Sequence, residues 1–289
     1  MFKKIVFFGI LNFFPIKSSV DLIVFSYDRG IQLYATLESS ERYLKGISQT
    51  YVLYRASEGK FDVPYQDMKE RFSCVNWIKQ GENPKKDFKP LLMSILCSSS
   101  ADYILFAVDD NIVKDFVDLS VCVNVLEKTK AYAFYLRLGK NINYSYSCKI
   151  RTPIPCMHTV DKNVFVWKFE DGKGDWNYPN SVDMTLFRKN NIISNISKLN
   201  FSSPNYFEGA WALRASSKLN GLCFNTSKIF NIPMNIVQQS HKNNPHMNLY
   251  SKEYLLKLYM DGYKINIDDF YNINNNSPHF EIEPKFIKR

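Results

Sequence analysis

Short apolar runs alternate along the first half of the chain with segments whose apolar residues recur at helical spacing. Residues 21–27 (DLIVFSY) form a β-rich apolar run that stops at the polar turn 28–30, and residues 31–44 then show a helical pattern. Residues 49–57 predict a second strand, and residues 63–72 predict a second helix. The chain therefore opens with two strand–helix units.

The alternation continues to about residue 139. A helix is expected over 88–99, a wholly apolar strand ending in two acids over 101–111, a helix over 115–130 and a strand over 130–139. Regular alternation of strands and helices is typical of a parallel sheet covered by helices. The predicted fold class is therefore α/β, with a Rossmann-like, mostly parallel central sheet flanked by helices.

No proline-rich, glycine-rich or single-sign charged tract divides the chain, so we expect one domain over residues 20–289. Within it, a regular half (20–141) precedes a less regular half (142–250) and a polar, peripheral tail (251–289). Residues 1–19 contain Lys3 and Lys4 before an apolar run. That run is shorter than the roughly 20 residues of a membrane-spanning helix, so segment 1–19 is interpreted as a short signal sequence, an interfacial anchor or a buried first element.

The chain is basic, with a formal net charge of +9. Positive potential favours an anionic partner such as a phosphate group or an anionic membrane surface. The lysines are spread along the whole sequence and no nucleic-acid recognition module accompanies them, so we expect no nucleic-acid partner. The 6 cysteines show neither a C-x-x-C pair nor zinc-finger spacing.

Polar residues follow the predicted strands, where open α/β sheets bind their ligands. The apolar strand YILFAV forces Asp109 and Asp110 out at the sheet edge, where two carboxylates repel each other unless a cation lies between them. Hard oxygen ligands of this kind select Mg²⁺ or Mn²⁺, which clamp phosphates. A solvated turn or a helix cap is the competing interpretation of the same residues.

The segments FSYDRGIQLYATLESSERYL, YVLYRAS and FAVDDN resemble bacterial glycosyltransferases of the GT-A fold, in particular family 2-like enzymes with an Asp-x-Asp metal motif. The resemblance continues in YLRLG, WNYPNSVDMTLFR and PNYFEGAW and covers roughly residues 21–241. Two departures are Gly30, where a proline is expected, and Asn111, which replaces the second acid of the motif.

The resemblance implies transfer of a sugar from a UDP- or GDP-sugar donor to a glycan, lipid or protein acceptor. It makes residues 20–141 the nucleotide-sugar-binding half and 142–250 the acceptor side. The residues that it implies for donor binding are Ser26, Tyr27, Asp28, Arg29, Arg55, Asp109, Arg137 and Trp176. For Mn²⁺ or Mg²⁺ they are Asp110, Asn111 and His241.

An inverting transferase also needs a base for the acceptor hydroxyl, and two acids compete for that role. Glu208 lies among aromatic residues in a helix-like run, and Asp183 lies in a segment that similar enzymes use to cover the donor sugar. Trp176 and Trp211 are the candidates for stacking on a sugar, although tryptophan also serves as a core residue.

Other functions remain open. A non-catalytic sugar- or nucleotide-binding protein keeps the aromatic residues without needing the acids. A nucleotidyltransferase usually has a glycine-rich phosphate loop after its first strand, whereas this turn offers only Gly30. Activated sugars are made in the cytosol, so we expect a cytoplasmic or membrane-associated protein, with export by the N-terminal segment as the alternative.

Overall fold

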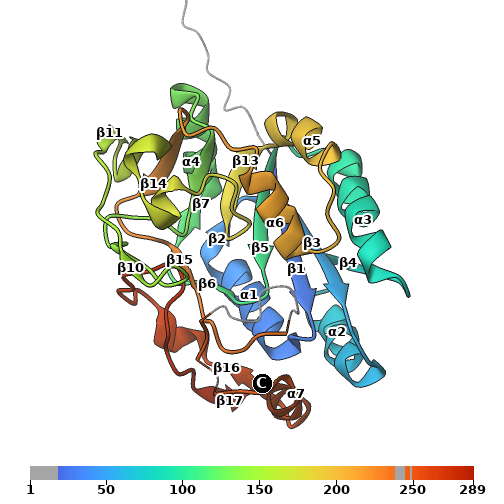
Figure 1. Ribbon diagram of the computed structural model, residues 1–289. Helices are drawn as coiled ribbons and strands as arrows, with labels where there is room; N and C mark the ends of the chain where they lie inside the picture. The colour runs from blue at the N-terminus through green and yellow to red at the C-terminus, as the bar shows by residue number, and fades with distance from the viewer. Residues whose placement is uncertain (1–18, 238–244, 248) are drawn as a thin grey trace, which may run out of the picture.

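The computed structural model describes residues 19–237, 245–247 and 249–289, so the predicted signal-like segment lies outside them except for Ser19. A nine-stranded sheet forms their centre, with helices on both faces (Figure 1). Its strands, in spatial order, are β11 (His158–Asp161), β12 (Val164–Lys168), β14 (Asn220–Phe224), β8 (Ala133–Tyr135), β13 (Thr185–Arg188), β5 (Tyr103–Val108), β1 (Val20–Tyr27), β3 (Ile47–Arg55) and β4 (Val75–Lys79).

The predicted α/β fold is confirmed, but the sheet is mixed: β14 pairs in parallel with β8, and the continuous parallel part runs from β4 to β5. There β1 pairs in parallel with β3 and β5, and β3 with β4. By contrast, β13 is antiparallel to both β5 and β8, and β12 is antiparallel to β14. With four residues in β13 and five in β12, these strands are too short for the sequence to reveal their direction.

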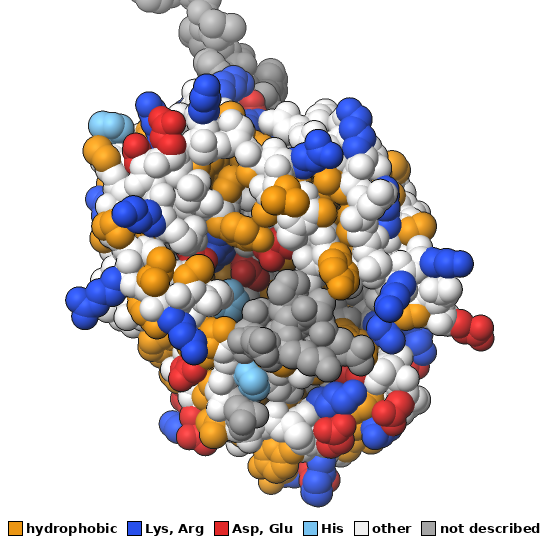
Figure 2. Space-filling view, viewed as in Figure 1, with side chains coloured by type: hydrophobic (Ala, Val, Ile, Leu, Met, Phe, Trp, Pro, Cys, Tyr) orange, Lys and Arg blue, Asp and Glu red, His pale blue; other side chains and the backbone are white. Residues whose placement is uncertain are grey.

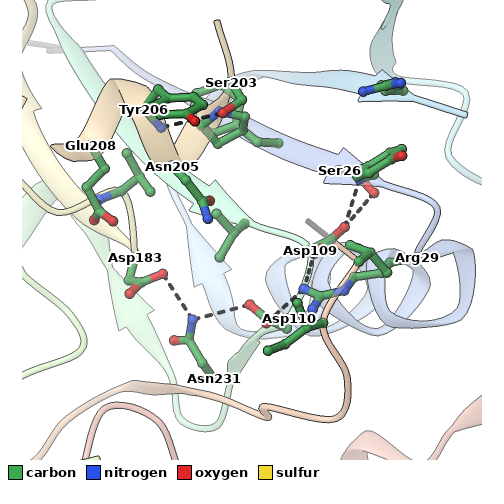
Figure 3. A pocket seen from close by; sticks show the side chains of 18 of the residues that line it. Ser26, Arg29, Asp109, Asp110, Asp183, Ser203, Asn205, Tyr206, Glu208 and Asn231 are labelled. Carbon is green, nitrogen blue, oxygen red and sulfur yellow. Dashed lines mark hydrogen bonds and ion pairs between the residues drawn. The ribbon is translucent and has the colours of Figure 1, made fainter. Parts of the chain in front are cut away.

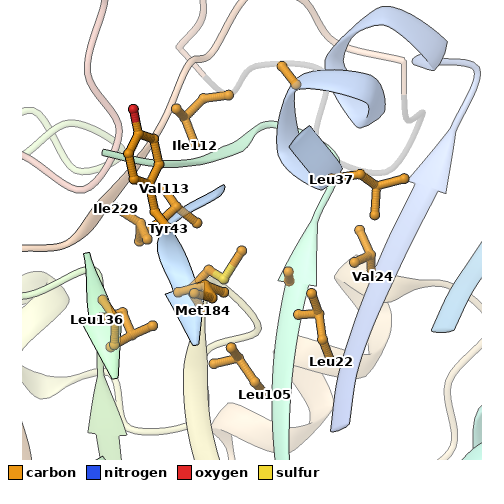
Figure 4. Packing of buried hydrophobic residues seen from close by; sticks show 14 of the residues in the cluster. Leu22, Val24, Leu37, Tyr43, Leu105, Ile112, Val113, Leu136, Met184 and Ile229 are labelled. Carbon is orange, nitrogen blue, oxygen red and sulfur yellow. The ribbon is translucent and has the colours of Figure 1, made fainter. Parts of the chain in front are cut away.

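Alternate residues of the central strands face two separate cores. On β1, Leu22 and Val24 belong to the core that α1 and α4 cover (Figure 4). Ile23 and Phe25 face the opposite core, which α3, α5 and α6 cover. A strand buried on both faces reads as a continuous apolar run, which is why the sequence identified it.

The described residues form seven α-helices, which pack on the two faces of the sheet and at its edge. They are α1 (Gly30–Tyr43), α2 (Gly59–Arg71), α3 (Pro84–Ser98), α4 (Leu119–Thr129), α5 (Lys189–Ser197), α6 (Pro204–Ala212) and α7 (Lys252–Met260). A Cβ added at Gly30 would lie 2.4 Å from the Pro64 Cβ. Glycine at this position therefore lets α2 pack closely against the start of α1.

None of the described helices is both long and apolar enough to cross a membrane.

Short elements complete the described structure. The two-stranded pairs are β2 (Leu44–Lys45) with β7 (Val117–Asp118), β6 (Asn111–Val113) with β15 (Ile229–Asn231), β9 (Tyr144–Ser145) with β10 (Ile150–Arg151), and β16 (Tyr263–Ile265) with β17 (Phe286–Lys288). The 3₁₀ turns are η1 (Phe169–Asp171), η2 (Gly174–Asn177) and η3 (Ile267–Phe270).

The segment 251–289 is not a peripheral tail, contrary to the expectation from its polar sequence. Leu255, Tyr259, Ile265 and Phe270 are buried in the same core as β1 and α1. The tail is therefore part of the domain and also reaches the cleft described below.

Candidate active site

A cleft of about 680 Å³ opens at the carboxyl ends of β1, β3 and β5. The antiparallel strand β13 starts at the same edge, because Thr185 pairs with Phe106 near the end of β5. Asp183, just before β13, thus reaches the acids that follow β5. Figure 2 shows acidic side chains inside this hollow and hydrophobic side chains on its rim.

Asp109 is held in the cleft floor by hydrogen bonds from the last two residues of β1. Its Oδ2 accepts from the Ser26 hydroxyl at 2.8 Å and from the Tyr27 N–H at 3.1 Å. Burial raises the pKa of Asp109 to about 6, with Arg29 opposing and Asp110 adding to the shift. Asp109 therefore ties β5 to the β1 turn.

Arg29 supplies the cation that the two neighbouring acids require. Its Nη1 lies 3.1 Å from Asp109 Oδ1 and 3.0 Å from Asp110 Oδ2, and its Nε donates to Asn235 Oδ1 at 3.0 Å. Burial opposes the charge, but the two carboxylates raise the pKa of Arg29. The repulsion from which the sequence predicted a metal ion is thus relieved by a guanidinium.

A single amide joins the acids on the two sides of the cleft. Asn231 Nδ2 donates to Asp110 Oδ1 at 3.2 Å and to Asp183 Oδ1 at 3.0 Å (Figure 3). Asn231 Oδ1 is buried without a hydrogen-bond partner among the described residues. The amide nitrogen thus occupies the space between the two carboxylates, and Oδ1 would face them only after a rotation of the amide.

Glu208 and Asp183 form the second acidic pair. Glu208 Oε1 accepts from the Val182 N–H at 2.9 Å. Burial, followed by the charge of Asp183, raises the pKa of Glu208 to about 7. A carboxyl group with this pKa takes up and releases a proton near neutral pH, as a general base must.

Five of the predicted donor-binding residues line the cleft, namely Ser26, Tyr27, Arg29, Arg55 and Asp109. The Arg55 guanidinium lies 4.7 Å from the centre of the Tyr27 ring, a cation–π contact. The predicted metal ligand Asp110 and the two predicted bases also line it.

Asp28 was predicted to bind the donor, but it does not line the cleft. Its Oδ1 accepts from the Ser57 N–H at 2.8 Å, and its Oδ2 accepts from Lys252 Nζ at 2.9 Å. The residue has a φ of 53°, a backbone conformation that aspartate tolerates in turns. Asp28 therefore ties the loop after β3 and the start of α7 to the β1 turn.

Arg137 and Trp176 are core residues, contrary to the prediction that they bind the donor. Arg137 is 1% exposed, and its Nη1 donates to Asp175 Oδ1 at 2.7 Å. Trp176 is fully buried and donates to the Ile142 carbonyl at 3.2 Å. Trp211, the other stacking candidate, is also fully buried.

Of the predicted metal ligands, Asn111 is not available to a metal ion. Asn111 is fully buried, and its Oδ1 accepts from the Val108 N–H at 2.9 Å, so this oxygen is already used. His241 lies outside the described residues. Within the described ranges, no group of three His, Cys, Asp or Glu side chains is arranged to hold a metal ion.

Sequence reasoning missed Asn231, Asn235 and His279, which all line the cleft. The Asn231 N–H donates to the Pro278 carbonyl and the Phe280 N–H donates to the Asn231 carbonyl, which fixes His279 beside β15. The available signal was the two asparagines inside the apolar run IFNIPMNIV. For His279 no sequence signal existed, because a distant segment delivers it.

One curated relative resembles this chain in sequence. The "Bifunctional glycosyltransferase pgtA" of Dictyostelium discoideum is 29% identical over 218 residues, which cover 66% of this chain and 28% of that protein. This chain thus matches little more than a quarter of its relative's length. The predicted resemblance to glycosyltransferases is confirmed by this relative, whereas the bacterial origin and the Asp-x-Asp variant stay predictions.

Solved structures show a distant likeness, and no family model matches the chain. S. aureus TarS (residues 1–349, in complex with UDP-GlcNAc) has 11% identity and a TM-score of 0.48, over 79% of this chain and 62% of that one. The 4-diphosphocytidyl-2C-methyl-D-erythritol synthase of Anaerococcus prevotii has 12% identity and a TM-score of 0.40, over 77% and 92%. Because both TM-scores lie below 0.5, we draw nothing about function from these structures.

Proposed function

We propose that this chain transfers a sugar from a nucleotide-sugar donor to a hydroxyl group of an acceptor. The observation that carries the proposal is a single cleft that holds two acidic sites, one paired with a cation and one with a raised pKa. One site pairs Asp109 and Asp110 with Arg29. The other holds Glu208, whose pKa is raised to about 7.

The donor is proposed to lie along the carboxyl ends of β1 and β3. Arg29, Arg55 and Lys85 line this side of the cleft and supply positive charge for a diphosphate. The nucleoside is proposed to lie beside Tyr27 and the end of β3, which line the same part of the cleft. When the sugar departs, negative charge develops on the diphosphate, and fixed cations stabilise it there.

The acceptor is proposed to lie on the Glu208 side. The Glu208 carboxylate takes the proton of the acceptor hydroxyl while the oxygen attacks the anomeric carbon and the bond to the diphosphate breaks. A direct displacement of this kind inverts the anomeric configuration. The charge of Asp183 keeps Glu208 a sufficiently strong base, because it raises the Glu208 pKa.

A divalent cation fits the cleft at Asp110 with Asn231 as a neighbouring oxygen ligand. The Asp110 carboxylate favours it, and the unpartnered Asn231 Oδ1 would join as a ligand if the amide rotated, because Nδ2 now faces Asp110. When bound, the cation would neutralise the diphosphate leaving group. Arg29 would have to release Asp110 first, since both contact the same carboxylate.

The proposal is tested by incubating the protein with UDP- and GDP-sugars, Mn²⁺ and a panel of glycoside, lipid and peptide acceptors, and measuring nucleoside diphosphate release. We expect acceptor-dependent release that falls about 10²- to 10⁴-fold in Glu208→Gln. The matched control is Glu41→Gln, on the exposed surface of α1. Release that is equal in wild type and Glu208→Gln would contradict the proposed base.

A further inference from the structure

The residue that directly follows the acidic pair of β5 has an amide side chain with a fixed orientation. Asn111 is fully buried, and its Oδ1 accepts the Val108 N–H at 2.9 Å. A backbone N–H can only donate, so the amide oxygen must face Val108 and the amide nitrogen must point away from it. That nitrogen lies 3.4 Å from Asp183 Oδ1. The only donor of the Asn111 side chain is therefore directed at Asp183.

A second asparagine directs its donor at the same carboxylate oxygen. Asn231 lies opposite Asn111 in the pairing of β15 with β6, and its Nδ2 lies 3.0 Å from Asp183 Oδ1. Asn231 also contacts Asp110 and has no backbone N–H that fixes its amide. Of the two amides, that of Asn111 therefore keeps its contact with Asp183 even if the Asn231 amide rotates.

The backbone next to Asp183 is held in an uncommon conformation. Met184 has a φ of 46°, in the left-handed region that residues other than glycine rarely adopt. Its side chain is fully buried in the core that α1 and α4 cover (Figure 4), and its carbonyl accepts the Leu136 N–H at 3.1 Å. Strain of this kind persists only where the surrounding structure fixes it. The packing of Met184 and the two amides thus set the direction of the Asp183 side chain together.

An aspartate at position 111 would not fit this arrangement. One of its oxygens would still accept the Val108 N–H, and the other would replace the amide nitrogen beside Asp183 Oδ1. Two carboxylates in such contact repel each other, most strongly where they are buried. An amide at position 111 thus explains the departure from the Asp-x-Asp motif.

We infer that Asn111 is a positioning residue, which together with Asn231 holds the Asp183 carboxylate in place beside Glu208. In Figure 3, Asp183 lies between Glu208 and Asn231, which joins it to Asp110. The inference rests on the proposed function, in which the diphosphate lies on the Asp110 side and the base is Glu208. A displaced carboxylate between these two sides slows the transfer step more than it weakens a donor held by its diphosphate.

Asn111→Asp is the main test variant, because it keeps the side-chain size and the acceptor for the Val108 N–H but removes the donor. Combining it with Asp183→Asn restores a donor and an acceptor with their positions exchanged. The matched control is Asn275→Asp. Asn275 is also fully buried, does not line the cleft, and donates from its Nδ2 to the Ser277 carbonyl at 2.8 Å.

Thermal denaturation measures the coupling of positions 111 and 183 without any substrate. Wild type, Asn111→Asp, Asp183→Asn and the double variant form the cycle. We expect Asp183→Asn to change Tm more favourably in the Asn111→Asp protein than in wild type, by about 3–6 °C. If Asn111→Asp does not fold, Asn111→Ala removes the donor without adding a charge and gives a second cycle with the same expected sign.

Steady-state kinetics of nucleoside diphosphate release, with a donor and an acceptor that wild type uses, measures the positioning. We expect Asn111→Asp to lower kcat about 10- to 100-fold and to change the donor KM less than about threefold. In Asn275→Asp, kcat and KM should both stay within about twofold of wild type, because a loss of stability alone does not move the cleft residues.

Additive effects of the two substitutions on Tm would overturn the inference, and so would equal kcat values for Asn111→Asp and Asn275→Asp. A tenfold rise in donor KM with unchanged kcat would instead make Asn111 a binding residue and would also overturn it. If wild type releases no nucleoside diphosphate from any donor while the coupling is present, the proposed function fails and the hold of Asn111 on Asp183 stands.

Discussion

Nη1 of Arg29 lies 3.0 Å from Oδ2 of Asp110, on the carboxylate that faces the cleft. The same guanidinium neutralises Asp109. Any metal ion that binds Asp110 must therefore compete with an internal cation. A diphosphate offers Arg29 an alternative anion, so metal binding and donor binding are expected to support each other.

The first prediction concerns Arg29→Gln, which removes this competitor. We expect Mn²⁺ alone to bind several-fold more tightly, because Asp110 is released. UDP or GDP should bind about 10- to 100-fold more weakly, since a charged hydrogen bond contributes roughly 1.5–3 kcal/mol. Calorimetric titrations with metal and with nucleotide separate the two effects.

The control is Arg71→Gln, which breaks an exposed ion pair with Glu41 far from the cleft residues. Both affinities should stay unchanged in that variant. A loss of Mn²⁺ affinity in Arg29→Gln would show that Arg29 supports the metal instead of competing with it.

The second prediction is a pH dependence of catalysis. The base must be ionised to accept a proton, so kcat/KM should rise with pH to a plateau, with a midpoint near the Glu208 pKa of about 7. Asp183→Asn removes the neighbouring negative charge and should move the midpoint to lower pH. A midpoint that is the same in both proteins would assign the titration to another group.

The third prediction is that the stability of the fold decreases as the pH rises, whereas kcat/KM increases. Glu208 has a folded pKa of about 7, above its ordinary value of 4.5, so the folded state holds this proton more tightly. Its contribution to stability is fully present below pH 4.5 and is lost as the pH rises through 7. Between pH 5 and 8, we expect wild type to lose about 1–3 kcal/mol more unfolding free energy than Glu208→Gln.

Urea denaturation of both proteins at the two pH values measures this difference. Asp109, whose pKa is raised to about 6, contributes a loss of the same sign in both proteins and therefore cancels. Parallel stability curves for wild type and Glu208→Gln would contradict a raised pKa at Glu208.

The sequence predicted the strand ends well and the residues between them poorly. The apolar runs of β1 and β5 are unambiguous because both faces are buried, and they place Arg29, Asp109 and Asp110 at one edge. Polar residues that follow short strands carry no such signal. Arg137 follows β8, yet it turns into the core to meet Asp175.

The site also depends on contacts that no local pattern encodes. Asn231 reaches the acids through the pairing of β15 with β6, in which it lies opposite Asn111. His279 lies in the segment 251–289, whose polar composition suggested a surface tail. Such long-range pairings are set by the folded chain rather than by local periodicity.

The fourth prediction separates the core function of Arg137 from the donor-binding role that its sequence position suggested. Arg137→Met should destabilise the fold by about 2–4 kcal/mol, because it leaves the partly buried Asp175 carboxylate without its cationic partner. The double variant with Asp175→Asn should recover part of that loss. Denaturant unfolding measures both, and a stable Arg137→Met protein with impaired nucleotide binding would return Arg137 to the donor site.

The most direct test of the central claim is calorimetric titration of the whole protein with UDP and GDP, with and without Mn²⁺, for wild type and Asp110→Ala. We expect one nucleotide to bind wild type more tightly with Mn²⁺, and Asp110→Ala to lose that metal-dependent gain. A folded wild-type protein that binds neither nucleotide in the presence of Mn²⁺ would contradict the assignment of this cleft to a nucleotide-sugar donor.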